Sequence, residues 1–146
     1  MSTNGPVVHG FNLVVADMAA SVAFYELVGL TIPAVSAEWE AHHRTVELAG
    51  GFDFDLDSIA FARQWNEGWP DRARGSMGVL GLQFASRDEV DATHRRLSEA
   101  GYATQQPPYD TFWGIRYAIV EDPDGNSVGL MSPVDPDRRS RPTPPT

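Results

Sequence analysis

Three aspartates alternate with apolar residues in one short segment of the chain. They are Asp53, Asp55 and Asp57, each separated from the next by a single phenylalanine or leucine. A period of two is typical of a half-buried strand, because successive side chains of a strand point to opposite faces. We expect the apolar side chains to pack on a helix and the carboxylates to face a ligand cleft, where they would attract a cation. A solvated strand face is the alternative interpretation.

Four tryptophans are the second notable group, because a flat indole ring stacks on aromatic ligands and attracts cations. Trp113 follows Phe112 just before a predicted strand that contains Tyr117, and Trp39 lies near a predicted hairpin. We expect these rings to contact a ligand. Packing in a core or a dimer interface is the alternative, and we favour it for Trp65.

Most catalytic chemistries lack their residues in this chain. There is no cysteine, which excludes disulfides, thiolate metal sites and cysteine nucleophiles. Lysine is absent as well, which removes Schiff-base chemistry and the lysine of a phosphate-binding loop. His42 and His43 lie near a predicted hairpin end, and we interpret both as surface residues. No spacing marks a Ser–His–acid triad or an acid–base pair of carboxylates.

The chain is strongly acidic, with 146 residues and a formal net charge of −9. An acidic protein repels phosphate backbones, so nucleic-acid binding is disfavoured and a cationic small molecule is favoured, although solubility alone also explains the charge. No segment is apolar over the roughly 20 residues that cross a bilayer, and the first residues do not resemble a secretory signal. We therefore expect a cytoplasmic protein that binds neither membranes nor nucleic acid.

The elements that must position these side chains occur twice, in the order βαβββ. A strand over 7–15, a helix capped by Asp17 and ended by Gly29, and strands over about 30–37, 43–48 and 52–57 form the first set. A strand over 79–85, a helix over 87–100 opened by Ser86 and Glu89, and strands over about 103–109, 115–121 and 127–132 form the second. Such duplication strongly constrains the fold.

We predict an α+β protein in which two βαβββ modules enclose a cleft. The first module covers residues 1–61, a loop rich in Trp, Gly and Arg covers 62–76, and the second module covers 77–132. Residues 133–146 are rich in proline and arginine, and we expect a flexible tail there.

Two segments resemble a known family. The segment 15–25, Val-Ala-Asp-Met-Ala-Ala-Ser-Val-Ala-Phe-Tyr, and the segments 112–117 and 122–126, Phe-Trp-Gly-Ile-Arg-Tyr and Asp-Pro-Asp-Gly-Asn, resemble the opening and closing modules of the vicinal oxygen chelate superfamily. This superfamily includes glyoxalase I, bleomycin-resistance proteins and extradiol dioxygenases. The resemblance implies paired βαβββ modules, often in a homodimer, but it does not settle the function because the fold carries several chemistries.

Enzymes of this family hold a divalent metal with His, Glu or Gln side chains on cleft-facing strand positions. The resemblance places one metal ligand at Gly10 and another at Gly129, and neither glycine has a side chain to donate. A relocated set of His9, Asp55 and Gln83 is a fallback that would hold a metal such as Fe, Mn, Ni or Zn.

We therefore expect a non-catalytic protein that sequesters a planar, cationic, antibiotic-like molecule, as bleomycin-resistance proteins do, without a cofactor. A metal-dependent lyase, isomerase or dioxygenase with atypical ligands is the alternative, and a scaffold with an empty cleft is a third. The expected ligand-binding residues are Asn12, Trp39, Asp53, Asp55, Asp57, Gln83, Phe112, Trp113 and Tyr117.

Overall fold

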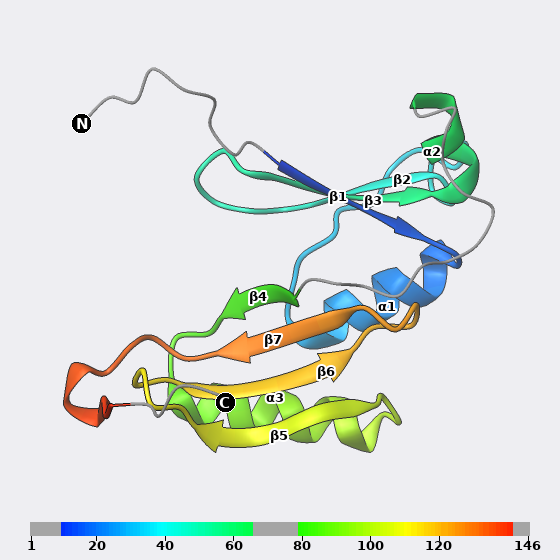
Figure 1. Cartoon of the computed structure of the whole chain (residues 1–146). Helices are drawn as coiled ribbons and strands as arrows, with labels where there is room; N and C mark the ends of the chain where they lie inside the picture. The colour runs from blue at the N-terminus through cyan, green and yellow to red at the C-terminus, as the bar shows by residue number, and fades with distance from the viewer. Residues whose placement is uncertain (1–9, 66–78, 142–146) are drawn as a thin grey trace, which may run out of the picture. The chain divides into compact units, whose positions relative to one another are not determined.

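The structure is a computed structural model that describes residues 10–65 and 79–141. The chain divides into two compact units, residues 1–73 and 74–146, and each is described by itself below (Figure 1). The expected α+β class is confirmed, since each unit combines helix with one mixed sheet. No helix among the described residues is long and apolar enough to cross a membrane.

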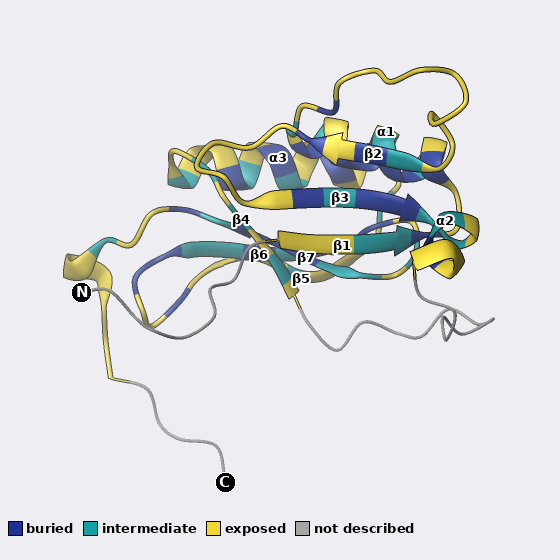
Figure 2. Ribbon diagram, turned by 90° about the horizontal axis from the view of Figure 1, so that it is seen from above, coloured by how far each residue is buried: buried dark blue, intermediate teal, exposed yellow. Residues whose placement is uncertain are grey.

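The first unit contains a three-stranded sheet with the order β1-β3-β2. Its elements are β1 (Gly10–Val15), α1 (Met18–Val28), β2 (His43–Val46), β3 (Asp53–Ser58) and α2 (Ile59–Trp65). Strand β1 is parallel to β3, and β2 is antiparallel to it. Strand β3 therefore lies in the middle, and Figure 2 shows it passing from an exposed start to a largely buried second half.

Helix α1 begins and ends where the sequence indicates. The side chain of Asp17 accepts a hydrogen bond from the Ala20 amide at 3.1 Å, and Gly29 ends the helix with a φ of 120°. Its buried Tyr25 ring packs on Phe54 of β3, with ring centroids 5.9 Å apart. The apolar face of β3 is thus the core face, as the alternation of its residues predicts.

The expected strand over residues 30–37 is wrong. Only an isolated bridge between Thr31 and Glu47 remains of it. Two features explain the loss. Pro33 has no amide hydrogen to donate to a sheet, and the buried guanidinium of Arg44 donates to the carbonyls of Ile32 and Pro33, at 3.3 and 3.1 Å. The arginine therefore takes up carbonyls that strand pairing would otherwise use.

Helix α2 occupies residues 59–65. We expected the first module to end at residue 61 and a loop to begin at residue 62. The hydroxyl of Ser58 accepts a hydrogen bond from the Phe61 amide at 3.0 Å, as a helix N-cap does. In the sequence, a helix start is indicated here by a serine, a common N-cap residue, followed by Ile-Ala-Phe-Ala-Arg-Gln. The rest of the expected loop, from residue 66 on, lies outside the described residues.

The second unit shows the complete βαβββ pattern. Its elements are β4 (Val79–Gln83), α3 (Arg87–Glu99), β5 (Thr104–Asp110), β6 (Arg116–Glu121), β7 (Ser127–Met131) and the 3-10 turn η1 (Pro136–Arg138). The sheet order is β4-β7-β6-β5, with β4 parallel to β7. Helix α3 covers one face of this sheet (Figure 1). The buried Val90 and Leu97 of α3 and Val128 and Leu130 of β7 contribute to its core.

The first part of the expected tail makes hydrogen bonds to the second unit, residues 142–146 lie outside the described residues, and the flexibility of residues 133–146 stays a prediction. The amide of Asp135 donates to the carbonyl of Gly114 at 2.9 Å, and the amide of Ser140 donates to the carbonyl of Phe112 at 2.8 Å. The Arg139 side chain donates to the carbonyl of Trp113 at 3.3 Å. Residues 135–140 are therefore held against the loop that precedes β6.

Candidate functional site

The three aspartates of β3 lie on the sheet face that points away from the core residues Phe54 and Leu56. Strand pairing adds neighbours on that face, because directly paired residues share a face. Asn12 of β1 is paired with Asp55, and on the other side His43 and Thr45 of β2 are paired with Asp57 and Asp55. We call Asn12, His43, Thr45, Asp55 and Asp57 the polar cluster.

Asp57 is the centre of the polar cluster, and only 1% of its surface is exposed. One carboxylate oxygen lies 2.6 Å from Nδ1 of His43, and the other accepts a hydrogen bond of 2.8 Å from the Asn12 amide nitrogen. Each carboxylate oxygen therefore has a hydrogen-bond partner. A buried charge needs such partners, because losing water without them is costly.

Asp55 lies closer to solvent, with 18% of its side chain exposed. The Thr45 hydroxyl donates a hydrogen bond to its Oδ1 at 2.7 Å. The same oxygen is 3.9 Å from Nε2 of His43, which in turn is 3.5 Å from the Thr45 hydroxyl oxygen. These last two distances are too long for effective hydrogen bonds, so Nε2 has no strong partner among these groups.

His43 is the residue that sequence reasoning missed, because we interpreted it as a surface histidine. Its place opposite Asp57 depends on the register of β2 on β3, which a single sequence does not reveal. The only sequence signal for this position is that His43 and Thr45 are two residues apart, as the aspartates of β3 are, so both lie on one face of their strand. Both oxygens of Asp57 contact other members of the cluster, His43 and Asn12, and its expected contact with a ligand stays a prediction.

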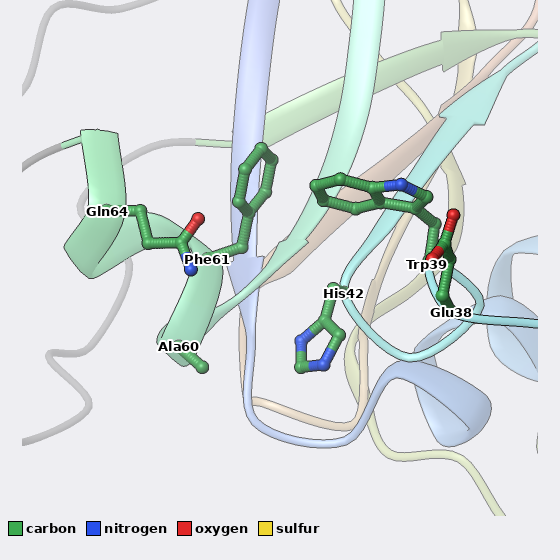
Figure 3. Close-up of a pocket in the computed structure, with 6 residues that line it drawn as sticks. All are labelled: Glu38, Trp39, His42, Ala60, Phe61 and Gln64. Carbon is green, nitrogen blue, oxygen red and sulfur yellow. The ribbon is translucent and has the colours of Figure 1, made fainter.

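A pocket of about 200 Å³ lies beside the polar cluster in the same unit. We call it the ring pocket, and its lining residues come from the loop before β2 and from α2 (Figure 3). They are Glu38, Trp39, His42, Ala60, Phe61 and Gln64. The rings of Trp39 and Phe61 meet edge to face at 5.2 Å, and the Phe61 ring also lies 5.5 Å from the His43 ring. Phe61 thus joins the ring pocket to the polar cluster.

A larger pocket of about 670 Å³ lies between α1 and residues 37–44. Its lining includes Asp17, Glu26 and Glu40, the buried Arg44, and several alanines. It contains no aromatic ring, so it lacks the stacking surface that a flat ligand needs. The ring pocket is smaller but has the better-suited chemistry.

In the second unit, four aromatic rings form a row. Phe112 lies 4.8 Å from Trp113, Trp113 lies 6.0 Å from Tyr117, and Tyr117 lies 6.3 Å from Tyr109. Burial is the largest cause that raises the pKa of Tyr117, and the neighbouring Tyr109 adds to it. The structure therefore brings together three of the predicted ligand-binding residues, Phe112, Trp113 and Tyr117, and leaves the first two largely exposed.

The ring of Tyr117 depends on a glycine in the neighbouring strand. A Cβ added to Gly129 of β7 would stand 2.9 Å from the Tyr117 hydroxyl oxygen and 3.0 Å from its ring. The family resemblance places a metal-binding glutamate at residue 129, so the tyrosine ring takes space that this side chain would need. A Cβ at Gly10 would likewise stand 2.9 Å from the backbone oxygen of Asp53.

The described residues do not fit the metal that the family resemblance implies. Within residues 10–65 and 79–141, no group of three or more His, Cys, Asp or Glu side chains is arranged to hold a metal ion. Of the fallback ligands, Asp55 is in the first unit, Gln83 ends β4 in the second, and His9 lies outside the described residues. The expectation of no cofactor stays a prediction.

One family model matches most of the chain. The model of the Glyoxalase/Bleomycin resistance protein/Dioxygenase superfamily matches residues 7–130. No curated protein matches the chain significantly.

Solved structures show the same fold at low sequence identity. A glyoxalase-related enzyme from Fulvimarina pelagi is 21% identical with a TM-score of 0.73, over 87% of this chain and 88% of that one. A hypothetical protein from S. aureus is 20% identical with a TM-score of 0.70, over 91% and 96% of the two chains. A lactoylglutathione lyase from Agrobacterium tumefaciens is 18% identical with a TM-score of 0.64, over 89% and 96%.

The contact between Gly129 and Tyr117 is testable by substitution. Gly129→Ala forces the Tyr117 ring to move, so we expect a loss of about 1 kcal/mol in the free energy of unfolding. We also expect the pKa of Tyr117 to fall towards its ordinary value as the ring gains water. Denaturant unfolding and ultraviolet titration of tyrosine ionisation measure these two effects.

The background variant Tyr117→Leu serves as the control, because it removes the ring that meets the new methyl group. In that background Gly129→Ala should destabilise the protein less, since coupled residues are not additive. An equal loss in both backgrounds would show that the ring does not depend on the glycine.

Proposed function

The chain belongs to the Glyoxalase/Bleomycin resistance protein/Dioxygenase superfamily, and from this premise we propose that it binds and sequesters a small aromatic cation without transforming it. The observation that carries the proposal is the ring pocket, whose lining combines the rings of Trp39 and Phe61 with the acidic residue Glu38. Flat rings next to a negative charge are the groups that recognise an aromatic cation.

The size and exposure of the ring pocket suit this role. Trp39 is 41% exposed, so a ligand can reach its side chain from solvent. The volume of about 200 Å³ has room for a single-ring group or for one end of a larger molecule. The net charge of −9 raises the local concentration of cations near the protein.

The second unit offers a further surface for a flat ligand. We propose that Phe112, Trp113 and Tyr117 stack on it and that the Gln83 amide donates a hydrogen bond to it. Gln83 and Tyr117 are paired with the same residue of β7, Met131, so both lie on the sheet face away from α3. A homodimer in the cytoplasm remains our proposal for the assembled protein.

The alternative function, a metal-dependent enzyme of the same superfamily, makes the opposite prediction about metal content. We expect protein purified without chelator to contain less than stoichiometric divalent metal, because Gly10 and Gly129 supply no donors. Elemental analysis by mass spectrometry measures the content. One tightly bound divalent ion per chain would contradict the sequestering function and support the enzyme.

Replacing the ring of Trp39 tests the ring pocket directly. We expect Trp39→Leu to weaken the binding of benzyltrimethylammonium about tenfold, which corresponds to roughly 1.4 kcal/mol and is the usual size of a cation–aromatic contact. Chemical-shift titration by NMR measures affinities in the weak range expected for so small a probe.

Trp65→Leu is the matched control, since Trp65 is an exposed tryptophan of the same unit that does not line the ring pocket. Its affinity for the probe should stay within about twofold of the wild-type value. Equal effects of the two substitutions, or no binding of the probe at all, would overturn the proposed function.

A further inference from the structure

We propose that the polar cluster of the first sheet binds a primary ammonium group of the ligand, with Nε2 of His43 and the carboxylate of Asp55 as its two acceptors. The inference rests on the proposed function, which it deepens by naming the cationic group. The ring pocket by itself selects only for an aromatic cation, whereas the polar cluster distinguishes an amine with N–H donors from a cation that lacks them.

The buried carboxylate of Asp57 determines which atom of His43 carries the hydrogen. An ionised carboxylate only accepts hydrogen bonds, and Asp57 accepts one already from Asn12 at 2.8 Å. With Asp57 ionised, the Nδ1 atom of His43, 2.6 Å from the other oxygen, is the donor. In a neutral imidazole the second nitrogen is then an acceptor, so Nε2 presents a lone pair.

The groups around Nε2 leave this lone pair for a ligand. The nearest hydroxyl, that of Thr45, donates its hydrogen to Asp55 at 2.7 Å and so has none to give to Nε2. The Asp55 carboxylate, 3.9 Å from Nε2, is a second acceptor. In the described part of the chain no arginine pairs with Asp55, and the neutral ring of His43, 3.9 Å away, leaves its charge uncompensated. Two neighbouring acceptors with one negative charge match an ammonium group, which has three donors and one positive charge.

Both acceptors are within reach of a ligand. The side chains of His43 and Asp55 are 34% and 18% exposed, whereas Asp57 behind them is 1% exposed. The Phe61 ring lies 5.5 Å from the ring of His43 and 5.2 Å from the ring of Trp39. Because Phe61 contacts both rings, a molecule whose aromatic end lies in the ring pocket has the polar cluster as a near neighbour.

Three probes that share a benzyl group separate charge from hydrogen bonding. Benzylamine has a charge and N–H donors, benzyltrimethylammonium has the charge alone, and benzyl alcohol has a donor without the charge. We expect the full chain to bind benzylamine about tenfold more tightly than either of the others, the size of one charge-assisted hydrogen bond. Chemical-shift titration by NMR gives the three dissociation constants.

Variants assign the preference to the polar cluster. His43→Phe keeps a ring and removes the acceptor, so the preference for benzylamine over benzyltrimethylammonium should fall to within about twofold. Asp55→Asn removes the charge of a partly exposed side chain, and we expect it also to weaken benzylamine about tenfold even if His43→Phe fails to fold. The control His94→Phe, on α3 of the second unit, should keep the wild-type preference.

Each outcome decides between the inference and the proposed function. Equal affinity for benzylamine and benzyltrimethylammonium, with both weakened by Trp39→Leu, would overturn the ammonium site and leave the sequestering function intact. A preference for benzylamine that survives both His43→Phe and Asp55→Asn would place the amine elsewhere and overturn the inference. If neither cation binds, both proposals fall.

Discussion

The carboxylate of Asp57 has lost nearly all contact with water, and two side-chain donors replace that water. His43 from β2 and Asn12 from β1 reach it from the strands on either side of β3. Hydrogen bonds to a charged group are strong, and removing one partner of a buried charge is costly. The three strands of the first sheet are therefore tied together at one point on the face away from their core. The orientation of His43, the spacing of its Nε2 from Asp55, and the contact of its ring with Phe61 all follow from this arrangement.

In the second unit the main constraint is steric, because a side chain at residue 129 would collide with the ring of Tyr117. Its sheet has a glycine in β7 where the family resemblance implies a metal ligand, and the ring of Tyr117 occupies the volume above that glycine. Trp113 and Phe112 continue the row of rings. At residue 129 a tyrosine ring thus takes the space that a metal-coordinating side chain would need. The two units share a parallel pair of strands with an antiparallel strand beside it, but the first presents a polar cluster next to the ring pocket and the second presents a row of four aromatic rings.

The sequence predicted those features that depend on local signals. Helix ends at Asp17 and Gly29 and the alternating faces of β3 appear as expected, because caps and period-two patterns act over a few residues. The missing strand over 30–37 was not predictable, since it depends on a guanidinium that reaches from Arg44 to the carbonyls of Ile32 and Pro33. The contact of His43 with Asp57 was missed because it also depends on residues far apart in the chain. It requires the observed register of β2 on β3, and a single sequence carries little information on register.

The central claim is that buried Asp57 holds the His43 ring with its hydrogen on Nδ1 and leaves Nε2 as an acceptor. Nitrogen-15 NMR of the imidazole, recorded at a pH at which the ring is neutral, reads the tautomer directly. We predict that Nδ1 gives the shift of a protonated nitrogen and Nε2 that of an unprotonated one, and that Asp57→Asn abolishes this difference. A wild-type spectrum with the hydrogen on Nε2 would contradict the account, since that atom could then accept nothing from a ligand.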